Sequence, residues 1–491
     1  MTHNTASLRT SRRSLAIAAL LAATALASSL AACTTIPEST PFASEPSQAK
    51  KVNPINTISE QVWWNDLGDP QLQRLMTQAL NNSPSLAMAE ARLNQAQAAV
   101  SQYRAANRPQ VGLDASVSEA KQSYNYLFGT PGPLSPLPEG YNDYGQTTLS
   151  FNWELDFWGK NRAAIAAASS NAEAAEADAA QARLVLSTAI ATAYVDLDRL
   201  YQERDLAERA VGIRSDSAKL VQDKLNNGVS NKAQDAQAQA GIFSARADLA
   251  ALDEQIELNK HLIAMLTGAA PDFANTLQRP ALSLNAQAFG NVPAQVNLDL
   301  IGRRPDVIAA RWRAESASAH IKQAHAAFYP NINIAAFAGF QALGLKNLFS
   351  SGSDIGQAGP ALSLPLFDGG ALKANLKSAE SEHALAIASY NQDVLEAMQQ
   401  VADTLSSQKA LQSRLDNSEQ ALTAYEESYR LSKLRYDGGL SDYTTLLIAE
   451  QSLISQRRTV ADLRSRAMTL DIALIKSLGG TYLGGQYTQT N

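Results

Sequence analysis

Four segments of the chain alternate between apolar and polar residues. In the clearest of them the apolar positions are Leu149, Phe151, Trp153, Leu155 and Phe157. A period of two predicts a strand with one apolar and one polar face. We therefore expect β-strands at residues 110–119, 146–157, 331–340 and 358–367. Pro360 and Pro365 fall within the last segment, which places that strand near an edge or bend of its sheet.

Two long stretches between these segments have the period of an α-helix. Residues 160–226 and 371–437 contain no proline, and their apolar residues lie three and four positions apart. At about 1.5 Å per residue, each stretch makes a rod of roughly 100 Å. Glycine turns end the rods, at Gly228 in the first and at Gly438 and Gly439 in the second. We expect helices to return along the rods at residues 231–267 and 442–478.

A shorter helical stretch precedes each pair of strands. Residues 70–107 and 294–328 show the same three-and-four spacing of apolar side chains. Pro109 and Pro330 follow them, and proline ends a helix because it cannot continue the backbone hydrogen bonds. Each half of the chain is therefore predicted to contain a helix, a strand pair and a long helical hairpin, an α+β composition.

The order of elements repeats because the chain is a duplication. A shift of 211 places residues 151–268 on 362–479 without a gap, and a shift of 221 places Pro84 on Pro305 and Pro109 on Pro330. The difference falls in a Gly- and Pro-rich loop of the first half. The expected organisation is a first repeat at 61–268, an equatorial linker at 269–293, a second repeat at 294–479 and a tail at 480–491.

The N-terminus has the pattern of a secreted lipoprotein. Arg12 and Arg13 precede an Ala-rich apolar run, which predicts a signal peptide at residues 1–32, with a membrane anchor as the alternative. The run ends in Leu30-Ala31-Ala32-Cys33, which resembles the bacterial lipobox. This resemblance implies N-acyl and S-diacylglycerol groups on Cys33, and Thr34 after it implies delivery to the outer membrane. Residues 33–60, rich in Ser, Thr and Pro, are expected to form a tether.

Composition and charge argue against nucleic acid and against catalysis. The formal net charge is -6, and an acidic chain is not expected to bind nucleic acid. The single cysteine excludes an intrachain disulfide. The five histidines lack metal-ligand spacing, and no Gly-rich phosphate loop occurs. Glu154 and Asp156 share one face of a predicted strand, and we interpret them as lumen-facing acids rather than a catalytic pair. No cofactor, metal or catalytic residue is predicted.

The strands are expected to lie in a membrane. Their length of about ten residues and the predicted outer-membrane address favour a barrel over two soluble hairpins. Aromatic residues near their ends agree with this: Tyr124, Tyr126, Tyr144, Phe157 and Trp158. Four strands cannot close a barrel, because open edges are not tolerated in lipid. Three chains would give twelve strands and a pore, continued by a coiled-coil tube of helices.

Several motifs resemble the outer membrane factor family, TolC and its acylated OprM- and NodT-like relatives. They include Trp63-Trp64-Asn65-Asp66-Leu67-Gly68-Asp69-Pro70, Gly302-Arg303-Arg304-Pro305-Asp306 and Leu155-Asp156-Phe157-Trp158-Gly159. The resemblance covers about residues 58–480. It implies a homotrimeric outer-membrane channel that joins a periplasmic adaptor and an inner-membrane pump, of RND type for a drug-efflux member. Export of protein and a lipid-tethered structural coiled coil are the alternatives.

The resemblance also implies a periplasmic gate at the tip of the second helical hairpin. The candidate gate residues are Tyr436, Asp437, Asp442 and Tyr443. Relatives often place an acid nine residues after the second glycine, where this chain has Ile448, with Glu450 two positions beyond. Asp442 is therefore either a substitute for that acid or a cap of the following helix.

Overall fold

A computed structural model describes residues 63–121, 140–282 and 301–480. The chain divides into two compact units, residues 1–53 and 54–491, and every described residue belongs to the second. The predicted signal peptide, Cys33, the tether, Tyr124 and Tyr126 lie outside the described residues, as do residues 283–293 of the expected linker and 481–491 of the expected tail.

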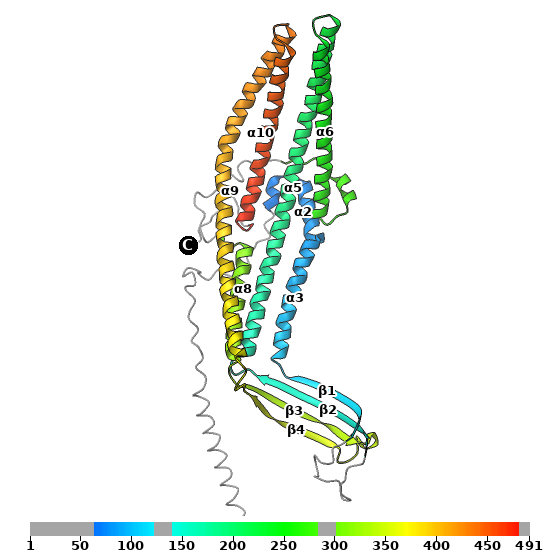
Figure 1. Cartoon of the computed structure of the whole chain (residues 1–491), viewed down its shortest axis with the longest axis vertical. Helices are drawn as coiled ribbons and strands as arrows, with labels where there is room; N and C mark the ends of the chain where they lie inside the picture. The colour runs from blue at the N-terminus through cyan, green and yellow to red at the C-terminus, as the bar shows by residue number, and fades with distance from the viewer. Residues whose placement is uncertain (1–62, 122–139, 283–300, 481–491) are drawn as a thin grey trace, which may run out of the picture. The chain divides into compact units, whose positions relative to one another are not determined.

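Two long helices dominate the second unit (Figure 1). Helices α5 (Lys160–Asn226) and α9 (Ala371–Asp437) have 67 residues each, and their bounds confirm the predicted rods. Gly159 and Gly370 precede them with φ of 81° and 93°, a left-handed conformation that glycine adopts without strain. Helices α6 (Lys232–Leu266) and α10 (Tyr443–Ser477) return along them, as expected.

The first predicted helix is wrong in one respect, because it is two helices. Helix α2 (Pro70–Asn82) ends at Ser83, and α3 (Pro84–Ala106) begins directly after it. Ser83 has ψ of 124°, since Pro84 disfavours helical geometry in the residue before it. In the second half, α8 (Pro305–Ala326) likewise begins on a proline. Pro84 and Pro305, which correspond in the duplication, are thus helix starts rather than interior positions.

The four strands form one antiparallel sheet in the order β1-β2-β3-β4. Their bounds are β1 Gln110–Ala120, β2 Asn142–Leu155, β3 Asn331–Leu343 and β4 Asp354–Ser363. Strand β4 lies at an edge, as its prolines predicted, but it begins and ends four residues earlier than expected. Pro365, which has no N–H to donate, follows its end. Strand β2 begins at Asn142 rather than at 146 and ends at Leu155, because Asp156 accepts hydrogen bonds from the first amides of α5.

The duplication is visible in the strand pairing. In the first repeat Gln110 pairs with Asn152, and in the second Asn331 pairs with Ser363. These positions are related by the same shifts of 221 and 211 residues that align the two halves of the sequence. The two hairpins therefore have one register, and β2–β3 is the junction between the repeats.

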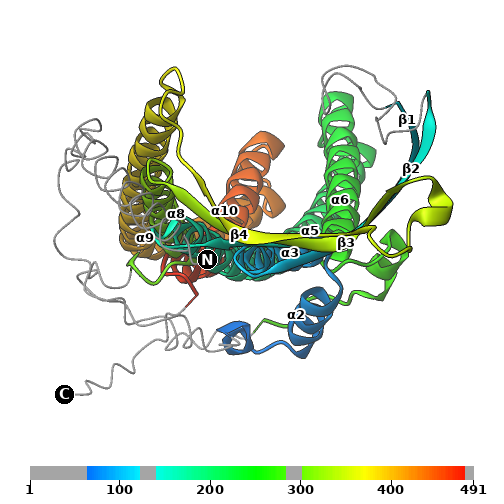
Figure 2. The same cartoon turned by 90° about the horizontal axis from the view of Figure 1, so that it is seen from below.

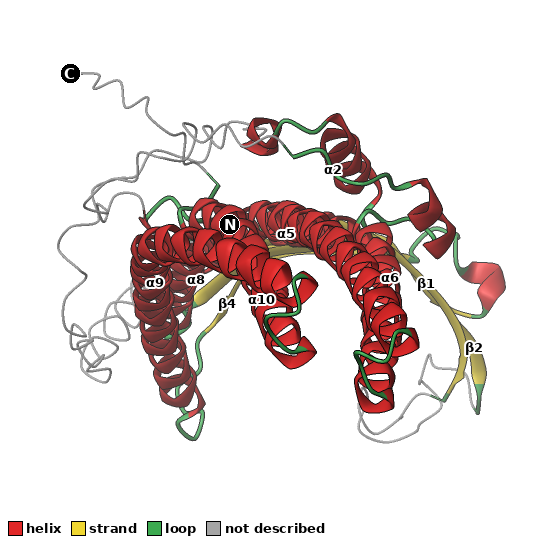
Figure 3. Cartoon of the chain, turned by 90° about the horizontal axis from the view of Figure 1, so that it is seen from above, coloured by secondary structure: helices red, strands yellow, loops and turns green. Residues whose placement is uncertain are grey.

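The helices pack beside one another in the same order as the strands. At the end that adjoins the sheet, α3 packs on α5, α5 on α8, and α8 on α9. Figures 2 and 3 show α9, α8 and α5 side by side. Farther from the sheet, α6 packs on α5 and α10 on α9, and α10 also contacts α5. The largest apolar cluster lies where α2 meets α5, α6 and α10.

A buried polar cluster fixes the N-terminal segment to this core. Tyr194 of α5 donates a hydrogen bond of 2.6 Å to Asp69 Oδ2, and the amide of Ala281 donates to the same oxygen at 2.7 Å. Burial raises the pKa of Asp69, but the hydrogen bonds from Tyr194 and from backbone amides outweigh it, so the net pKa is lowered. Asp69 therefore stays charged and ties α2, α5 and the chain around Ala281 together.

Candidate functional site

The sheet has one apolar and one polar face, although it covers no core of its own. The strand register places the alternating apolar residues of all four strands on the same face. Those of the middle rows are Val111, Leu113, Leu149, Phe151, Trp153, Ile334, Ala336, Ala338, Ala358 and Leu362. Leu113 is 71% exposed and Leu362 is 69% exposed. A four-stranded apolar surface exposed to this extent is the mark of a face that meets lipid.

The opposite face carries polar and small residues in the same rows. They are Gly112, Asp114, Ser116, Thr148, Ser150, Asn152, Asn333, Gln341, Gln357 and Ser363. Phe337, which pairs with Ser150, and Ile355, which lies in the row of Asp114 and Thr148, are exceptions to the pattern. A polar face backing a lipid-exposed one is the arrangement that lines an aqueous lumen. The clean alternation of the sequence is thus confirmed as two chemically different surfaces.

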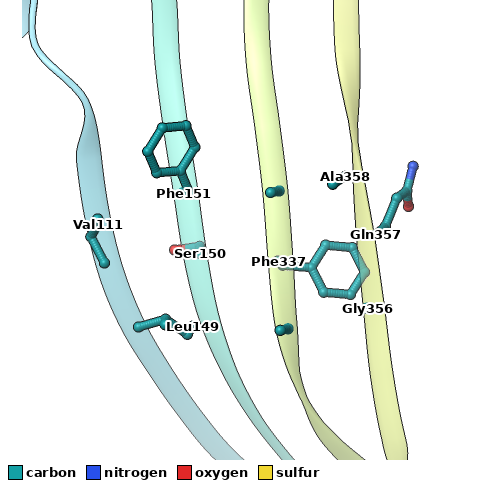
Figure 4. A pocket seen from close by; sticks show the side chains of 10 residues that line it. Val111, Leu149, Ser150, Phe151, Phe337, Gly356, Gln357 and Ala358 are labelled. Atoms are coloured by element: carbon teal, nitrogen blue, oxygen red, sulfur yellow. The ribbon is translucent and has the colours of Figure 1, made fainter.

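A shallow hollow of about 530 Å³ lies along the middle of the sheet. Figure 4 shows Leu149, Phe151 and Val111 among the side chains that line it. Carbon atoms dominate its wall, and it contains no charged side chain. The hollow therefore provides apolar contacts, and no charged group lines it.

Aromatic side chains mark the boundary between the sheet and the helices. Trp158 stacks on Tyr329 with ring centroids 4.8 Å apart, and its Nε1 donates to the carbonyl of Pro330 at 2.9 Å. Trp158 and Phe157 are nevertheless half exposed or more. Tryptophan and tyrosine with one side exposed are typical of a membrane–water interface.

Glu154 and Asp156 have separate partners at the junction of strand β2 and helix α5. Glu154 contacts Lys160 at 2.5 Å, and Asp156 accepts hydrogen bonds from the amides of Asn161 and Arg162. Each carboxylate is engaged in joining β2 to α5. Among the described ranges, no group of His, Cys, Asp and Glu could hold a metal ion. No helix within the same ranges is long and apolar enough to cross a membrane.

The tips of the two helical hairpins pack against one another through the candidate gate tyrosines. Tyr436 and Tyr443 are buried, with ring centroids 5.8 Å apart. They belong to an apolar cluster with Ala218, Val221 and Ala238 of the first hairpin. Burial and the charge of Glu450 raise the pKa of Tyr443 to about 12. Both tyrosines therefore hold the hairpins together as neutral side chains.

The two candidate aspartates lie on the outside of the tip. Asp442 is the N-cap of α10, and its Oδ1 accepts from Thr445 N at 2.9 Å and from Thr445 Oγ1 at 2.7 Å. These bonds lower the pKa of Asp442. Asp437 pairs with Lys433, one turn earlier, at 3.1 Å. The expected capping role of Asp442 is confirmed, and both aspartates are exposed in this chain.

The backbone conformation differs among the glycines at the three predicted turn positions. Gly228 and Gly439 have φ of 74° and 72°, so both adopt the left-handed conformation that ends a helix. Gly438 has φ of -78°, which any residue adopts. Only the first two positions require glycine for the backbone.

Two cations of α5 reach across to the second hairpin, and the sequence did not reveal them. Lys224 Nζ lies 3.6 Å from the ring centroid of Tyr436 and donates to the Tyr436 carbonyl at 2.7 Å. Arg214 Nε lies 3.2 Å from Glu450 Oε1. Arg214 also donates to Gln451 Oε1 at 2.7 Å. Near the hairpin tips, α5 is thereby linked at two levels to residues more than 200 positions away, once to α9 and once to α10.

Glu450 could have been found from its position in the helix. It falls on the stripe of Tyr443, Leu446 and Leu453, at spacings of three and four, and that stripe is buried. A carboxylate on an apolar stripe predicts a buried partner of opposite charge. Ile448, in the slot where relatives carry an acid, is 64% exposed. The acid of this chain thus faces α5 rather than the surface that carries Ile448.

The sequence is similar to those of known outer-membrane proteins. The sequence pattern described as "Outer membrane efflux protein" matches residues 75–269 and 298–480. The multidrug resistance outer membrane protein MdtP of Escherichia coli K12 is 30% identical over 456 residues, 90% of this chain and 91% of that protein. The fusaric acid resistance protein FusA of Burkholderia cepacia is 35% identical over 321 residues, 65% of this chain and 59% of that protein.

A solved structure shares the arrangement of strands and helices. The outer membrane protein VceC of Vibrio cholerae is 42% identical, with a TM-score of 0.78 over 85% of this chain and 98% of that one. The fold is that of the trimeric channels of this group, with a barrel to which each chain gives four strands and a tube of helices below it. These proteins conduct solutes out of the cell with an adaptor and an inner-membrane pump, and theirs is not a family of enzymes. The chain belongs to the outer membrane efflux protein family, and it is an outer-membrane channel of a tripartite efflux system.

Proposed function

We propose that this channel exports small organic solutes delivered by an RND-type pump, that lipid on Cys33 adds a second membrane anchor, and that the tip of the α9–α10 hairpin closes its periplasmic end. The observation that carries the proposal is the paired contact between the hairpins, Lys224 with Tyr436 and Arg214 with Glu450. A tube of helices can open only if one set of hairpins moves against the other. These contacts hold the second hairpin in one position against the first.

The choice of small solutes rests on the relatives. MdtP is named for multidrug resistance and FusA for resistance to fusaric acid, a small organic acid. A deletion strain tested against a panel of drugs and organic acids is expected to become more susceptible and to accumulate more solute. Unchanged susceptibility together with loss of a secreted protein would favour the alternative, type I protein secretion.

The lipid anchor rests on the lipobox around Cys33. Two or more acyl chains give stable anchoring where one is marginal. Metabolic labelling with radioactive palmitate is expected to label the native protein and not the Cys33→Ser variant. Absence of label from the native protein would refute this part of the proposal.

Asp442 and Asp437 are acidic groups exposed at the tip. Both cap hydrogen bonds of Asp442 use Oδ1, so the cap does not exclude a second role for the carboxylate among the three tips of the trimer. Tyr436 and Tyr443 contribute by fixing the tip on α5 and α6. In this proposal the two aspartates place negative charge at the periplasmic opening. The two tyrosines hold the hairpin tip in its position against α5 and α6.

Two substitutions separate the cap from the charge. Asp442→Asn keeps a good N-cap residue and removes the charge, whereas Asp442→Ala removes both. Single-channel conductance and its response to divalent cations should change in both variants if the charge is part of the gate. A change in Asp442→Ala alone would assign Asp442 to the cap only, and no change in either would remove it from the gate.

A further inference from the structure

An aromatic residue, Phe337, lies on the polar face of the sheet. It is the middle residue of β3, six positions from Asn331 and from Leu343. It pairs with Ser150 of β2 and with Gln357 of β4, and Figure 4 shows it between these two residues. Phe337 is 37% exposed. Because this face lines an aqueous lumen, the ring is in contact with the contents of the channel at the middle of the barrel wall.

The packing of the chain does not account for this ring. Phe337 belongs to none of the buried apolar clusters of the described residues, and no aromatic ring in the described ranges stacks on it. Burial of a phenylalanine side chain is a large source of stability, and a ring left exposed contributes little of it. The role of Phe337 is therefore to be found in what passes through the lumen.

A second apolar side chain, Ile355, lies beside the ring on the same face. Ile355 of β4 pairs with Gly339, which is two positions after Phe337 on β3. Phe337 and Ile355 are therefore diagonal neighbours on adjacent strands, about 7–8 Å apart, which is within reach of an aromatic side chain. The residues around this pair on the polar face are polar or small: Thr148, Ser150, Ala335, Gly339, Gln357 and Gly359.

Gly339 leaves a gap in the row of side chains next to Phe337. A Cβ at this position would overlap the carbonyl oxygen of Thr147 in the backbone of β2. A glycine within a strand marks such a close approach of another backbone, so no larger residue fits at position 339. Ile355 and Thr148, which pair with Gly339 from its two sides, are therefore not separated by a side chain. The flat side of an aromatic solute can approach the wall at this gap.

The wall around this apolar pair is negatively charged. The four described strands contain no lysine, arginine or histidine. The acids on their polar face are Asp114 and Glu154, and Glu154 is neutralised by Lys160. Asp114 is exposed and lies in the same row as Ile355. A cation is therefore favoured over an anion at this level of the lumen.

We propose that Phe337 and Ile355 form a contact site on the wall of the lumen for the aromatic part of amphiphilic organic cations in transit. The face of an aromatic ring attracts a cation. Asp114 lies two strands and one row from Phe337, about 12 Å away, so it attracts the cation through its field and not by contact. The inference rests on the proposed export of small organic solutes, and it specifies their class.

A weak contact suits a conduction pathway. A solute must bind well enough to enter and loosely enough to leave, so a tight site would stop the flux. Contact between a cation and an exposed ring changes affinity by about two- to fivefold. The trimer carries three such sites, one from each chain. They favour an aromatic cation over a plain cation without trapping it.

Reduction of the potassium current through single channels in planar bilayers tests the contact. Three probe ions separate ring from charge: phenyltrimethylammonium has a ring and a positive charge, tetramethylammonium has the charge alone, and benzenesulfonate has a ring and a negative charge. Phenyltrimethylammonium should reduce the native current at the lowest concentration of the three. Phe337→Ser should raise its half-effect concentration about two- to fivefold and leave that of tetramethylammonium unchanged.

Two further variants separate the ring from its surroundings. Asp114→Asn removes the charge and keeps the ring, and it should bring the half-effect concentrations of phenyltrimethylammonium and benzenesulfonate about twofold closer. Phe151→Ser makes the same substitution as Phe337→Ser on the opposite face of the neighbouring strand, and it should change none of the three values. If Phe337→Ser trimers fail to reach the outer membrane, Phe337→Leu keeps the apolar bulk without the ring and should show the same shift.

Three results would overturn the proposal. They are an unchanged half-effect concentration of phenyltrimethylammonium in Phe337→Ser trimers, an equal change for all three ions, which would show a steric constriction only, and unchanged discrimination between the two aromatic ions in Asp114→Asn. A deletion strain with unchanged drug susceptibility would contradict the proposed cargo instead. The expected shifts in the bilayer would still support the contact in that case, so the two failures are distinguishable.

Discussion

Arg214 of α5 and Glu450 of α10 form an ion pair with 3.2 Å between Nε and Oε1, and Glu450 is only 1% exposed. Burial raises the pKa of Glu450, and the Arg214 guanidinium lowers it in part. A buried pair of this kind contributes specificity of packing more than net stability, but removing one partner leaves an uncompensated charge. The pair therefore fixes the position of the α9–α10 hairpin relative to the α5–α6 hairpin.

The Arg214→Met variant is expected to destabilise the hairpin tips by about 3 kcal/mol, because Glu450 would remain buried without its partner. Hydrogen–deuterium exchange should become faster at the tips of both hairpins. The double variant Arg214→Met/Glu450→Leu should return exchange toward the native rate, since no buried charge remains. Equally fast exchange in the single and double variants would show that the pair does not set the position of the hairpins.

The Lys224→Met variant is expected to increase the time that the channel spends open. A cation over a buried tyrosine ring is worth about 1–2 kcal/mol, and methionine keeps the length of the side chain while removing the charge. Single-channel recordings should show more frequent openings than the native protein. Lys219→Met, an exposed position on the same helix, is the control, and equal behaviour of the two variants would contradict the role of Lys224.

A charge on the apolar face of the sheet should prevent insertion, and a charge on the polar face should not. Arginine near the middle of a bilayer costs about 2–4 kcal/mol on the lipid side of a barrel strand. Leu113→Arg should therefore deplete trimers from the outer membrane. Ser116→Arg, on the other face of the same strand, should leave trimer levels unchanged and shift ion selectivity toward anions. Equal loss of trimers in both would refute the assignment of the faces.

Asp471 of α10 predicts a dependence of stability on pH. Burial raises its pKa to about 6, although a hydrogen bond of 2.9 Å from Gln408 opposes the rise. A raised pKa means that the folded state favours the protonated acid, so its contribution is present below the ordinary pKa near 4 and is lost as pH rises through about 6. Asp471→Asn should remove this loss.

At pH 7.5 the Asp471→Asn variant should be more stable than the native protein by roughly 1–2 kcal/mol, less than the full two-unit shift because solvent screens the site. At pH 4 the two should be equal. Thermal unfolding followed by circular dichroism at both pH values gives the comparison. A stabilisation that is the same at both pH values would show that protonation of Asp471 is not its source.

Periodic patterns in the sequence correctly predicted the elements that have one apolar face along their whole length. The long helices α5 and α9 and the existence of four strands followed from spacing alone, because each element is regular over many residues. The break at Ser83 was missed, since the apolar spacing continues across it and only Pro84 marks it. The ends of β4 were displaced because the repeat was extended across Pro365.

In the gate region, the sequence predicted some of the residues at the hairpin tip but not the residues that contact them from the other hairpin. Tyr436 and Asp442 were identified from a resemblance, and the cap of Asp442 followed from its position before a helix. Lys224 and Arg214 were not identified, because their partners lie more than 200 residues away on another hairpin. Such contacts depend on how the two hairpins pack against each other, and the sequence near each residue does not indicate that packing. Only Glu450, an acid on an apolar stripe, signalled that a cation must face it.

The central claim is that the polar face of the sheet lines a conducting lumen and the apolar face meets lipid, and neighbouring residues of β2 test it most directly. Ser150→Cys and Leu149→Cys lie on opposite faces. In planar bilayers the account predicts that a charged thiol reagent lowers the conductance of Ser150→Cys trimers in discrete steps and leaves Leu149→Cys unaffected. No conductance in either, or the same response from both residues, would contradict it.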